Sequence, residues 1–449
     1  LHFYETFLSV YDPETREKRG VYYTPEPVVS FIVRSLHQIL KDKFEISSGL
    51  ASKNVTLLDP AGGTLGFLAQ AIETAVDEFK RNYGEGAVKD FLQEQILQNY
   101  YAFELMMAPY AIGHMKMSFL LEELGYRMDD HERMKYYLTN TLEMQELDAS
   151  KFPGMSSLSE ESHSAGEVKK QVPILVILGN PPYSGISSNK SEIETEINKG
   201  NPYIAGYDIK EIKENGRTKY QLAPKQKTAK RKFTTKQKTW IGEQIEYYKI
   251  IDGEWFGERK HWLQDDYVKF IRFAQWKIDQ AGEGVIGFIT NHSYLDNPTF
   301  RGMRQSLLNS FDEIYVLDLH GNSLKKEKTP AGGKDQNVFD IMQGVAIVFF
   351  VKNKKKTTQK VHHNEIFGLR DEKYNWLHSN SLKSVKWNKL KPESPFYFFI
   401  PRDNENLAHY NKFYPLNKIF PVNVTGIVTA RDNFVIDFDY KKLERRIEE

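Results

Sequence analysis

The sequence predicts an α/β protein built on an open, mostly parallel sheet with helices on both faces. Short apolar runs alternate with helical patterns, and turn residues such as glycine and asparagine follow the runs. The run at 174–178 is apolar throughout, as expected of a strand buried on both faces of a parallel sheet. We expect strands at 55–58, 99–103, 174–178, 284–290, 313–317 and 344–351. We expect helices at 24–40, from about 65, at 106–121 and at 267–280.

Length and composition exclude several classes of protein. The 449 residues suffice for two or three domains, and the 40% hydrophobic and 27% charged residues are those of an ordinary globular protein. There is no run of the roughly 18 apolar residues that a membrane span requires and no secretory signal, so we expect a cytoplasmic protein without a membrane partner. Cys is absent, which excludes thiolate sites, and we expect no metal. Because the chain begins with Leu1 and not Met, we expect a fragment or a processed product.

The chain divides into three expected parts. We expect an N-terminal helical segment at 1–50 and the catalytic domain at 51–385. Aromatic clusters begin after that, and we expect 386–449 to be the start of another domain. Within the catalytic domain, the Ser- and Glu-rich residues 150–170 predict a flexible surface loop. Residues 184–260 predict a polar insertion with a basic centre.

Four short motifs follow the expected strands in order. They are Asp59-Pro60-Ala61-Gly62-Gly63, Glu104, Asn140 and Asn180-Pro181-Pro182-Tyr183. Ligands of open α/β sheets bind beyond the carboxyl ends of the strands, so these motifs predict one binding site. The two glycines would let the backbone approach a ligand closely. Glu104 would accept the hydroxyls of a ribose, or it caps the helix that follows.

Two common nucleotide-binding motifs are missing from the sequence. There is no complete Gly-x-Gly-x-x-Gly, which argues against a nicotinamide dehydrogenase. There is also no Gly-x-x-x-x-Gly-Lys-Ser/Thr, which argues against an ATPase.

The tetrapeptide Asn180-Pro181-Pro182-Tyr183 carries the most specific signal. An exocyclic amino group on an aromatic base is a poor nucleophile because its lone pair is delocalised into the ring. The Asn180 amide oxygen and the Pro181 carbonyl can both accept hydrogen bonds from such a group, which draws its nitrogen toward tetrahedral geometry. Two consecutive prolines fix these acceptors at little ordering cost, and Tyr183 offers a face for stacking.

The centre of the insertion is strongly basic. Residues 210–238 contain eleven Lys or Arg and two Glu, interleaved with aromatic residues. This composition is typical of a loop that contacts phosphates and equally of a solvated loop. The formal net charge of +1 predicts no strong attraction of the whole chain to nucleic acid. The candidate DNA-binding residues are Lys225, Lys227, Lys230, Arg231 and Lys232.

With these residues, the sequence resembles the gamma class of DNA adenine-N6 methyltransferases, and most of all the methyltransferase part of the Type ISP restriction-modification enzymes. The similarity covers roughly residues 1–385 and reaches into the tail. It implies a class I methyltransferase fold (Rossmann-like) and S-adenosylmethionine as the cofactor. It also implies methyl transfer to adenine N6 of a base flipped out of double-stranded DNA. The lack of Cys agrees with a target other than cytosine carbon 5, whose methylation uses a Cys nucleophile.

The resemblance assigns roles residue by residue. The cofactor role falls on Tyr23, Thr24, Pro25, Asp59, Pro60, Ala61, Gly62, Gly63, Glu104 and Asn140. Catalysis falls on Asn180, Pro181, Pro182 and Tyr183, and base stacking on Tyr183 and Phe339. Leu65 and Gly66 depart from the family, where many members have Gly then Thr. The stretch that includes His292 also looks like the family. For both Phe339 and His292, a structural role and a functional role stay open.

The resemblance further implies partners and a longer polypeptide. The full enzyme would carry a nuclease and an ATP-driven translocase, and 386–449 would open a target-recognition domain. Two alternatives stay open. One is a protein glutamine N5-methyltransferase, which uses the same tetrapeptide. The other is a non-catalytic DNA-recognition subunit on the same scaffold.

Overall fold

The computed structural model describes most of the chain. The described residues are 23–129, 131–144, 156–183, 187, 189–197, 202–203, 207–214, 217–224, 229–230, 233–256, 261–354, 358–403, 406–410, 412–422, 434 and 436–448.

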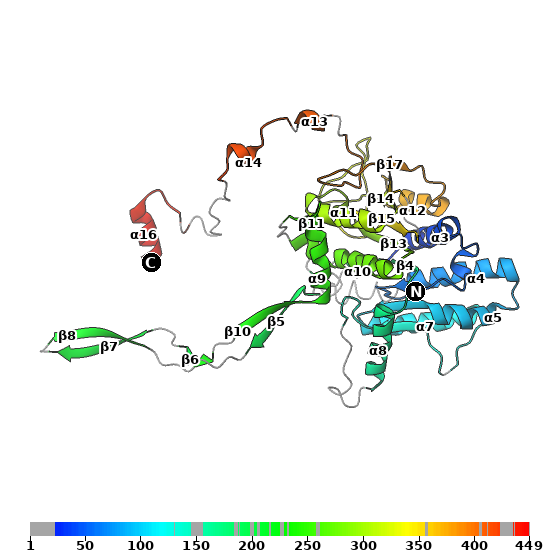
Figure 1. Ribbon diagram of the computed structural model, residues 1–449, viewed down its shortest axis with the longest axis horizontal. Helices are drawn as coiled ribbons and strands as arrows, with labels where there is room; N and C mark the ends of the chain where they lie inside the picture. The colour runs from blue at the N-terminus through cyan, green and yellow to red at the C-terminus, as the bar shows by residue number, and fades with distance from the viewer. Residues whose placement is uncertain are drawn as a thin grey trace. The chain divides into compact units, whose positions relative to one another are not determined.

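A nine-stranded sheet forms the centre of the protein (Figure 1). Its order is β17-β16-β14-β15-β13-β4-β1-β2-β3. The strands are β1 (Leu57–Asp59), β2 (Tyr100–Glu104), β3 (Lys135–Leu138), β4 (Val176–Gly179), β13 (Gly284–Asn291), β14 (Glu313–Asp318), β15 (Val345–Lys352), β16 (Lys360–Glu365) and β17 (Asn388–Leu390). The central strands β1, β4, β13 and β14 are buried at every position, because other elements cover both faces of the sheet.

Most neighbouring strands run parallel, as the sequence predicts. β4 pairs in parallel with β1 and β13, and β1–β2, β2–β3 and β14–β16 are also parallel. β15 runs antiparallel between β13 and β14, and β17 runs antiparallel to β16. The strand order reverses beside β1, and such a switch point is where open α/β sheets bind ligands. The six predicted strands are confirmed to within a few residues, whereas β3, β16 and β17 are additional to them.

Helices α3 (Glu26–Lys43) and α10 (Asp266–Ala281) cover opposite faces of β13. A Cβ at Gly287 would meet Leu36 of α3, whereas a Cβ at Gly284 would meet Ile278 of α10. Strand positions an odd number apart point to opposite faces, so the two helices lie on opposite sides of the sheet. Further long helices of the sheet region include α4 (Gly66–Tyr83), α7 (Met107–Glu123), α11 (Arg301–Ser310) and α12 (Arg370–Ser379). The predicted helices are confirmed.

The prediction of a flexible surface loop at 150–170 is wrong for most of these residues. Residues 156–170 form helix α8 (Ser156–Lys170). Ala165 and Val168 of this helix are buried, and the Glu161 carboxylate accepts a hydrogen bond from the backbone N–H of Leu138 at 2.7 Å. The helical stretch contains only three apolar residues, Leu158, Ala165 and Val168, so its sequence signal is weak and tertiary contacts decide the structure here.

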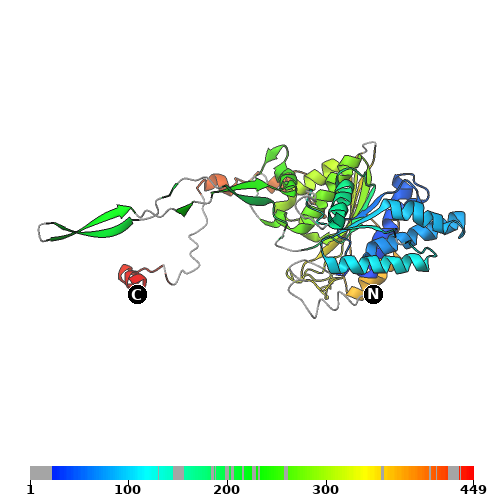
Figure 2. The same cartoon turned by 90° about the horizontal axis from the view of Figure 1, so that it is seen from below.

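The insertion contains antiparallel strand pairs. β5 (Glu192–Ile197) pairs with β10 (Phe233–Lys238), and β7 (Tyr207–Glu214) pairs with β8 (Arg217–Pro224) (Figure 2). The short strands are β6 (Pro202–Tyr203) and β9 (Ala229–Lys230), and a further small pair is β11 (Ile250–Ile251) with β12 (Glu254–Trp255).

The last part of the expected insertion packs on the sheet domain. Helix α9 (Trp240–Glu246) contacts α10 and buries Ile241 and Ile245. A Cβ at Gly242 would lie 2.0 Å from the Ser191 carbonyl oxygen, so only glycine allows this close approach.

The chain separates into two compact units, Leu1–Ile400 and Pro401–Glu449. The first unit extends past the expected boundary at 385, because β17 joins the main sheet and Arg304 donates to the Phe396 carbonyl at 2.9 Å. The second contains the helices α13 (Leu407–Tyr410), α14 (Leu416–Ile419) and α16 (Tyr440–Glu448). Its expected role in target recognition stays a prediction.

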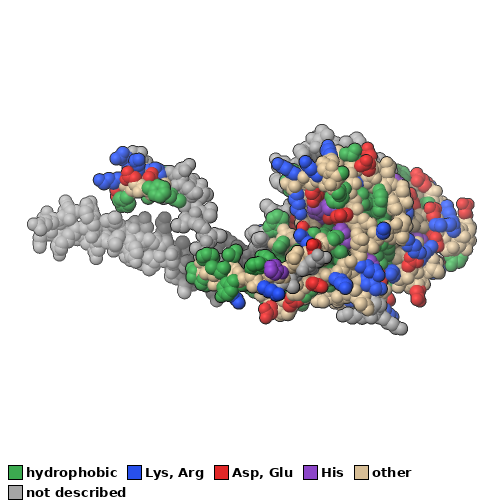
Figure 3. Space-filling model, turned by 90° about the horizontal axis from the view of Figure 1, so that it is seen from above, with side chains coloured by type: hydrophobic (Ala, Val, Ile, Leu, Met, Phe, Trp, Pro, Cys, Tyr) green, Lys and Arg blue, Asp and Glu red, His purple; other side chains and the backbone are tan. Residues whose placement is uncertain are grey.

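Two properties of the surface bear on partners. None of the helices in the described part of the chain is both long enough and apolar enough to cross a membrane. On the face drawn in Figure 3, Lys and Arg side chains are interspersed with Asp and Glu, in keeping with the net charge of +1. Attraction to a polyanion must therefore come from local clusters of charge.

Candidate cofactor and catalytic site

A pocket opens at the carboxyl ends of β1, β2, β3 and β4. It brings together all four motifs that the sequence singles out. Its lining residues are Tyr23, Thr24, Val29, Pro60, Ala61, Gly62, Gly63, Thr64, Gly66, Phe67, Phe103, Glu104, Leu105, Met106, Pro109, Thr139, Asn140, Thr141, Asn180, Pro182, Asn189, Asp266 and Phe270. Pro25, Asp59, Pro181 and Tyr183 are also predicted for this site but do not line the pocket.

Three hydrogen bonds hold the glycine loop after β1. The Gly62 N–H donates to the Phe103 carbonyl at 2.8 Å, and the Tyr136 hydroxyl donates to the Gly63 carbonyl at 2.6 Å. The Thr141 hydroxyl donates to the Pro60 carbonyl at 2.5 Å. Gly63 has a φ of 53°, and a Cβ there would meet nothing within 4 Å, so the bare backbone faces open space. The predicted close approach of this backbone to a ligand stays a prediction.

Leu65 explains why this loop tolerates a departure from the family pattern. It adopts the left-handed conformation, with φ 61° and ψ 38°, directly before α4. That conformation costs a non-glycine residue roughly 1–2 kcal/mol. The Leu65 side chain is fully buried and packs against Gly62 and Gly113, and burial of a leucine contributes about 1.5–3 kcal/mol. Packing therefore offsets the strain that a glycine would avoid.

Glu104 orders the turn before α7 and lines the pocket. Its Oε1 accepts the backbone N–H groups of Leu105 at 2.9 Å and Met106 at 2.8 Å, which precede α7. Its Oε2 accepts the Gly63 N–H at 2.9 Å and so ties β2 to the glycine loop. The carboxylate thus orders the turn before α7 and also lines the pocket. Its binding of a ribose stays a prediction, and Oε2 has a further lone pair for it.

Asp59 lies beneath the glycine loop and is fully buried. Its Oδ1 accepts the Ala61 N–H at 3.1 Å, and its Oδ2 has no hydrogen-bond partner among the described residues. Burial, with a smaller contribution from the Glu104 charge, raises the pKa of Asp59 to about 7, against the opposing Ala61 hydrogen bond. Below that pH the carboxyl is neutral, and its burial costs much less than that of a carboxylate.

This burial predicts a pH dependence of stability. Because the pKa of Asp59 is higher in the folded chain than in the unfolded chain, the folded state binds more protons between about pH 4 and 7. The free energy of unfolding should therefore fall as pH rises through this window, by at most about 4 kcal/mol. We expect Asp59→Asn to have a higher Tm than the ligand-free wild type at pH 8 and a similar Tm at pH 4.5. An equal Tm difference between the variant and the wild type at both pH values would contradict the raised pKa of Asp59.

Two side chains orient the Asn180 amide. Its Nδ2 donates to the Thr24 hydroxyl at 3.0 Å, and its Oδ1 accepts the Tyr183 hydroxyl. Tyr183 also reaches the Ile289 carbonyl at 3.1 Å, and its side chain is buried. The amide oxygen therefore has a fixed direction. Sequence reasoning names these residues but does not predict the bonds between them.

Phe339 lies beside the tetrapeptide. Its ring is 6.4 Å from the ring of Tyr183 in an edge-to-face arrangement, although it comes from the segment between β14 and β15. The predicted stacking partners of the base are thus neighbours, and their contact with a base stays a prediction.

Sequence reasoning misses several pocket residues after the tetrapeptide. Asn140 donates to the Asn189 side chain at 2.8 Å, and Asn189 donates to Asp266 at 2.9 Å. Asp266 begins α10, so this chain of bonds links the β3 end to a helix on one face of the sheet. An acidic residue at the start of a predicted helix is the available signal, and capping is its simpler interpretation.

Most of the predicted DNA-binding residues lie outside the described residues. Lys225, Lys227, Arg231 and Lys232 are among them, and Lys230 belongs to β9, where only the backbone is described. Their role stays a prediction.

His292 belongs to a polar cluster at the ends of β13 and β14. Its Nδ1 donates to Asp318 at 3.0 Å, and its Nε2 accepts from Asn322 at 3.2 Å. With His320 and Glu327 it forms a group whose ligand atoms lie within 4.8 Å of one another, a spacing that could hold a metal ion. Both nitrogens of His292 already have partners, which supports a structural role.

Part of the chain matches a known protein family. Residues 2–211 match the family model described as N-6 DNA Methylase. Among curated proteins no relative matches.

Three similar solved structures cover 99% of the chain. The DrdV–DNA complex has a TM-score of 0.68 and 23% identity. The complex of a nuclease-deletion mutant of the Type ISP restriction-modification enzyme LlaGI with a DNA substrate mimic has a TM-score of 0.67 and 22% identity. The Type ISP enzyme LlaBIII bound to DNA has a TM-score of 0.67 and 24% identity. The chain spans only 39%, 32% and 27% of those three chains, respectively. At this identity the likeness shows the fold, which is the predicted class I methyltransferase fold.

The matched residues 2–211 include the Thr24 segment, the glycine loop, Glu104 and the Asn180 tetrapeptide. Over this segment the chain is similar to the N-6 DNA methylase family.

Proposed function

We propose that the chain transfers a methyl group from S-adenosylmethionine to N6 of an adenine flipped out of double-stranded DNA, as the modification part of a restriction-modification enzyme. One observation carries this proposal. A single pocket joins the bare backbone of the glycine loop, the Glu104 carboxylate and the oriented amide of Asn180.

The charges of the pocket fit a cationic ligand that carries hydroxyl groups. Glu104 and Asp266 line it, and its described lining contains no Lys or Arg. Such a pocket disfavours a polyphosphate nucleotide and favours a sulfonium compound with a ribose. The backbone at Gly63 leaves room for close approach, and Glu104 and Asn140 offer polar groups to the sugar and the base.

The chain's own residues would supply the positioning for transfer. When bound, the cofactor supplies an electrophilic methyl group. The Asn180 amide oxygen, with the Pro181 carbonyl, accepts the amino hydrogens of the base and turns its nitrogen lone pair toward that methyl. Thr24 and Tyr183 hold the amide in this direction before the base arrives, so little ordering is left to the reaction. The base would lie against Tyr183 and Phe339.

The wider assembly follows from the same proposal. The chain spans less than two fifths of the similar DNA-bound enzymes, so we propose that it works in a longer polypeptide with nuclease and translocase parts. Residues 386–449 would open its target-recognition domain, and the basic insertion would contact DNA. The reaction would take place in the cytoplasm.

An assay with two acceptors tests the proposed substrate. The protein is incubated with isotopically methyl-labelled S-adenosylmethionine and either duplex DNA or glutamine-containing protein. We expect label in DNA alone. Label in protein would favour the glutamine methyltransferase, and binding of DNA without transfer to either acceptor would favour a recognition subunit.

Removing the Tyr183 hydroxyl should separate positioning from binding. Tyr183→Phe deletes the donor that fixes the Asn180 oxygen, and a hydrogen bond of this kind contributes about 0.5–1.5 kcal/mol. We expect kcat to fall by roughly tenfold while the Kd for DNA changes little. The matched control is Tyr248→Phe, which loses a buried hydroxyl bonded to Gln275 at 2.8 Å away from the pocket. Equal kcat values for the two variants would contradict the role of Tyr183.

A further inference from the structure

The segment between β14 and β15 reaches the candidate catalytic site. β13 and β14 both run antiparallel to β15, so they run in the same direction. Because β4 is parallel to β13, β14 and β4 end at the same edge of the sheet. Residues 319–344, here called the β14–β15 loop, therefore begin beside the site. Near its end, the loop places Phe339 against Tyr183.

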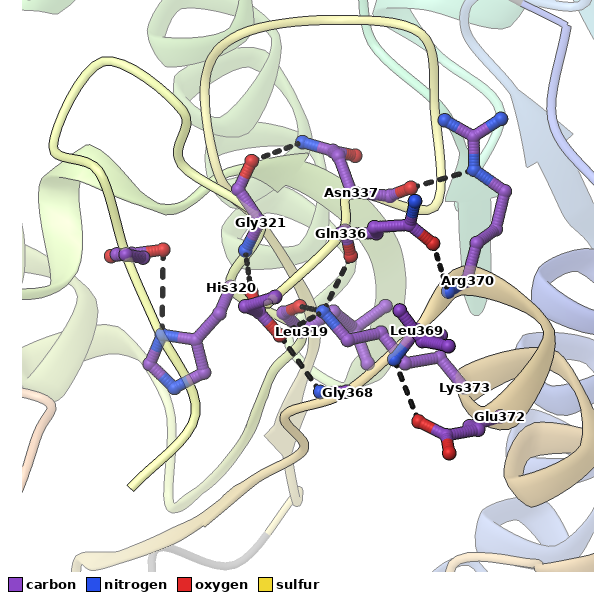
Figure 4. A network of polar contacts seen from close by, with 12 residues as sticks. Leu319, His320, Gly321, Gln336, Asn337, Gly368, Leu369, Arg370, Glu372 and Lys373 are labelled. Carbon is purple, nitrogen blue, oxygen red and sulfur yellow. Dashed lines mark hydrogen bonds and ion pairs between the residues drawn. The ribbon is translucent and has the colours of Figure 1, made fainter. Parts of the chain in front are cut away.

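A buried ion pair fixes the base of this loop (Figure 4). The Lys373 ammonium lies 2.8 Å from Asp335, and both side chains are fully buried. Lys373 also donates to the carbonyls of Leu319 at 2.7 Å and Gln336 at 2.6 Å. Asp335 accepts the N–H of Gly321 at 2.7 Å. This bond joins the first arm of the loop, which leaves β14, to the second arm, which leads to β15. Both charges are hydrogen-bonded to the loop backbone, so the loop has a set shape before any ligand binds.

A second anchor sets the position of Phe339. The Arg370 guanidinium at the start of α12 donates to the carbonyls of Asn337 at 2.7 Å and Phe339 at 2.8 Å. The Asn337 amide donates to the Gln343 carbonyl at 2.6 Å. Figure 4 shows the Arg370 side chain reaching toward Asn337 from α12. The aromatic ring at the site and the tip of the loop are thus held by one framework.

The tip of the loop carries four exposed lysines. A turn at 329–333 closes it, with the Gly332 N–H bonded to the Thr329 carbonyl at 2.8 Å. The acidic residue of this stretch, Glu327, turns inward and accepts the Asn322 N–H at 2.8 Å. The exposed tip is therefore almost purely cationic. Its lysines are Lys325, Lys326, Lys328 and Lys334.

Two of these lysines face each other. Lys328 and Lys334 are bridge partners across the two arms of the tip. Like charges at directly opposite positions destabilise such a pair. Lys325 lies 3.9 Å from the Asp296 carboxylate, but no ion pair of Lys326, Lys328 or Lys334 occurs within the described part of the chain. A phosphate group bound between Lys328 and Lys334 would relieve their repulsion.

We propose that the β14–β15 loop is a preformed DNA-contacting element. Its tip lysines bind backbone phosphates, while its anchored end holds Phe339 beside the base pocket. The inference deepens the proposed function and rests on it, because DNA is the polyanion that a base-flipping pocket would meet. Phosphate contacts position a duplex without reading its sequence, so the loop would set the register of the target strand.

The salt dependence of DNA binding tests this proposal. The variant K326Q/K328Q/K334Q is compared with wild type by fluorescence anisotropy on one duplex of about 30 base pairs, over a series of NaCl concentrations. Loss of three phosphate contacts should lower the slope of log K against log salt by roughly 2.7. We expect the Kd at low salt to rise at least about tenfold and S-adenosylmethionine binding to stay unchanged.

A matched control uses lysines at the opposite edge of the sheet. Lys53 precedes β1, Lys89 precedes β2, and Lys354 follows the antiparallel β15, and all three are exposed. K53Q/K89Q/K354Q removes the same total charge and should leave the slope within about 0.5 of wild type. Equal slopes for the two triple variants would overturn the inference. A wild type that neither binds nor methylates DNA would instead overturn the proposed function itself.

The single variant K334Q provides an independent check. It removes the like-charge pair, so the Tm of the free protein should not fall, while DNA binding should weaken about twofold or more. A lysine with a merely structural role would show the reverse, with a lower Tm and unchanged DNA binding, and that result would overturn the proposal.

Discussion

Replacement of Asn180 by Ala is expected to lower kcat for DNA methylation by at least about 100-fold. Loss of one preorganised polar group at a reacting centre typically costs about 10²- to 10³-fold in kcat. Asn180 is oriented by Thr24 and Tyr183 before substrate binds, so its removal deletes an acceptor that requires no reorganisation. Single-turnover methylation of a DNA duplex measures the effect, and calorimetry measures S-adenosylmethionine binding in parallel.

The matched control for this variant is Asn54→Ala. Asn54 is exposed and lies before β1, at the far edge of the sheet from the pocket. It should have the wild-type kcat. If Asn180→Ala retained more than about a tenth of the wild-type rate, the tetrapeptide could not have the role that we propose.

Replacement of Lys373 by Met is expected to destabilise the first compact unit by about 3–5 kcal/mol. Removal of one member of a buried ion pair leaves the other charge without compensation. Asp335 is fully buried, and the backbone N–H groups of Gly321 and Gly368 alone cannot replace the ammonium. Thermal unfolding should show a Tm lower by roughly 6–20 °C. DNA methylation should fall as well, because the same framework holds the segment that carries Phe339.

A double-mutant cycle separates the pair from its surroundings. Asp335→Asn alone should also be destabilising, and the double variant should lose less than the sum of the two single losses. Additive losses would show that Lys373 acts through its carbonyl partners, Leu319 and Gln336, and not through Asp335. The exposed pair Lys53–Glu94 serves as a control and should contribute at most about 1 kcal/mol.

The parts of the fold that can be predicted from the sequence are those with a strong local signal. Strand β4 is an uninterrupted apolar run, and β13 and β15 pair over their whole length, so their burial is visible in composition alone. Strand β3 is short, with the partly exposed Lys135 at its start, and lacks such a signal. Helix α8 escapes prediction because its stability comes from contacts with β3 and not from periodicity.

The candidate site divides in the same way. Motifs at strand ends can be found because parallel strands bring their carboxyl ends to one edge, whatever lies between them in sequence. The bond between Thr24 and Asn180 joins residues 156 positions apart, and no sequence pattern encodes such a pair. The same holds for the chain from Asn140 through Asn189 to Asp266, which depends on how α10 meets the sheet.

Chemical identification of the methylated base decides whether Asn180 activates an adenine. DNA incubated with the wild-type chain and S-adenosylmethionine is digested to nucleosides and analysed by mass spectrometry. We expect N6-methyladenine in the wild-type sample and none above background with Asn180→Ala. Methylcytosine in the digest, or equal N6-methyladenine from both proteins, would contradict the proposed mechanism.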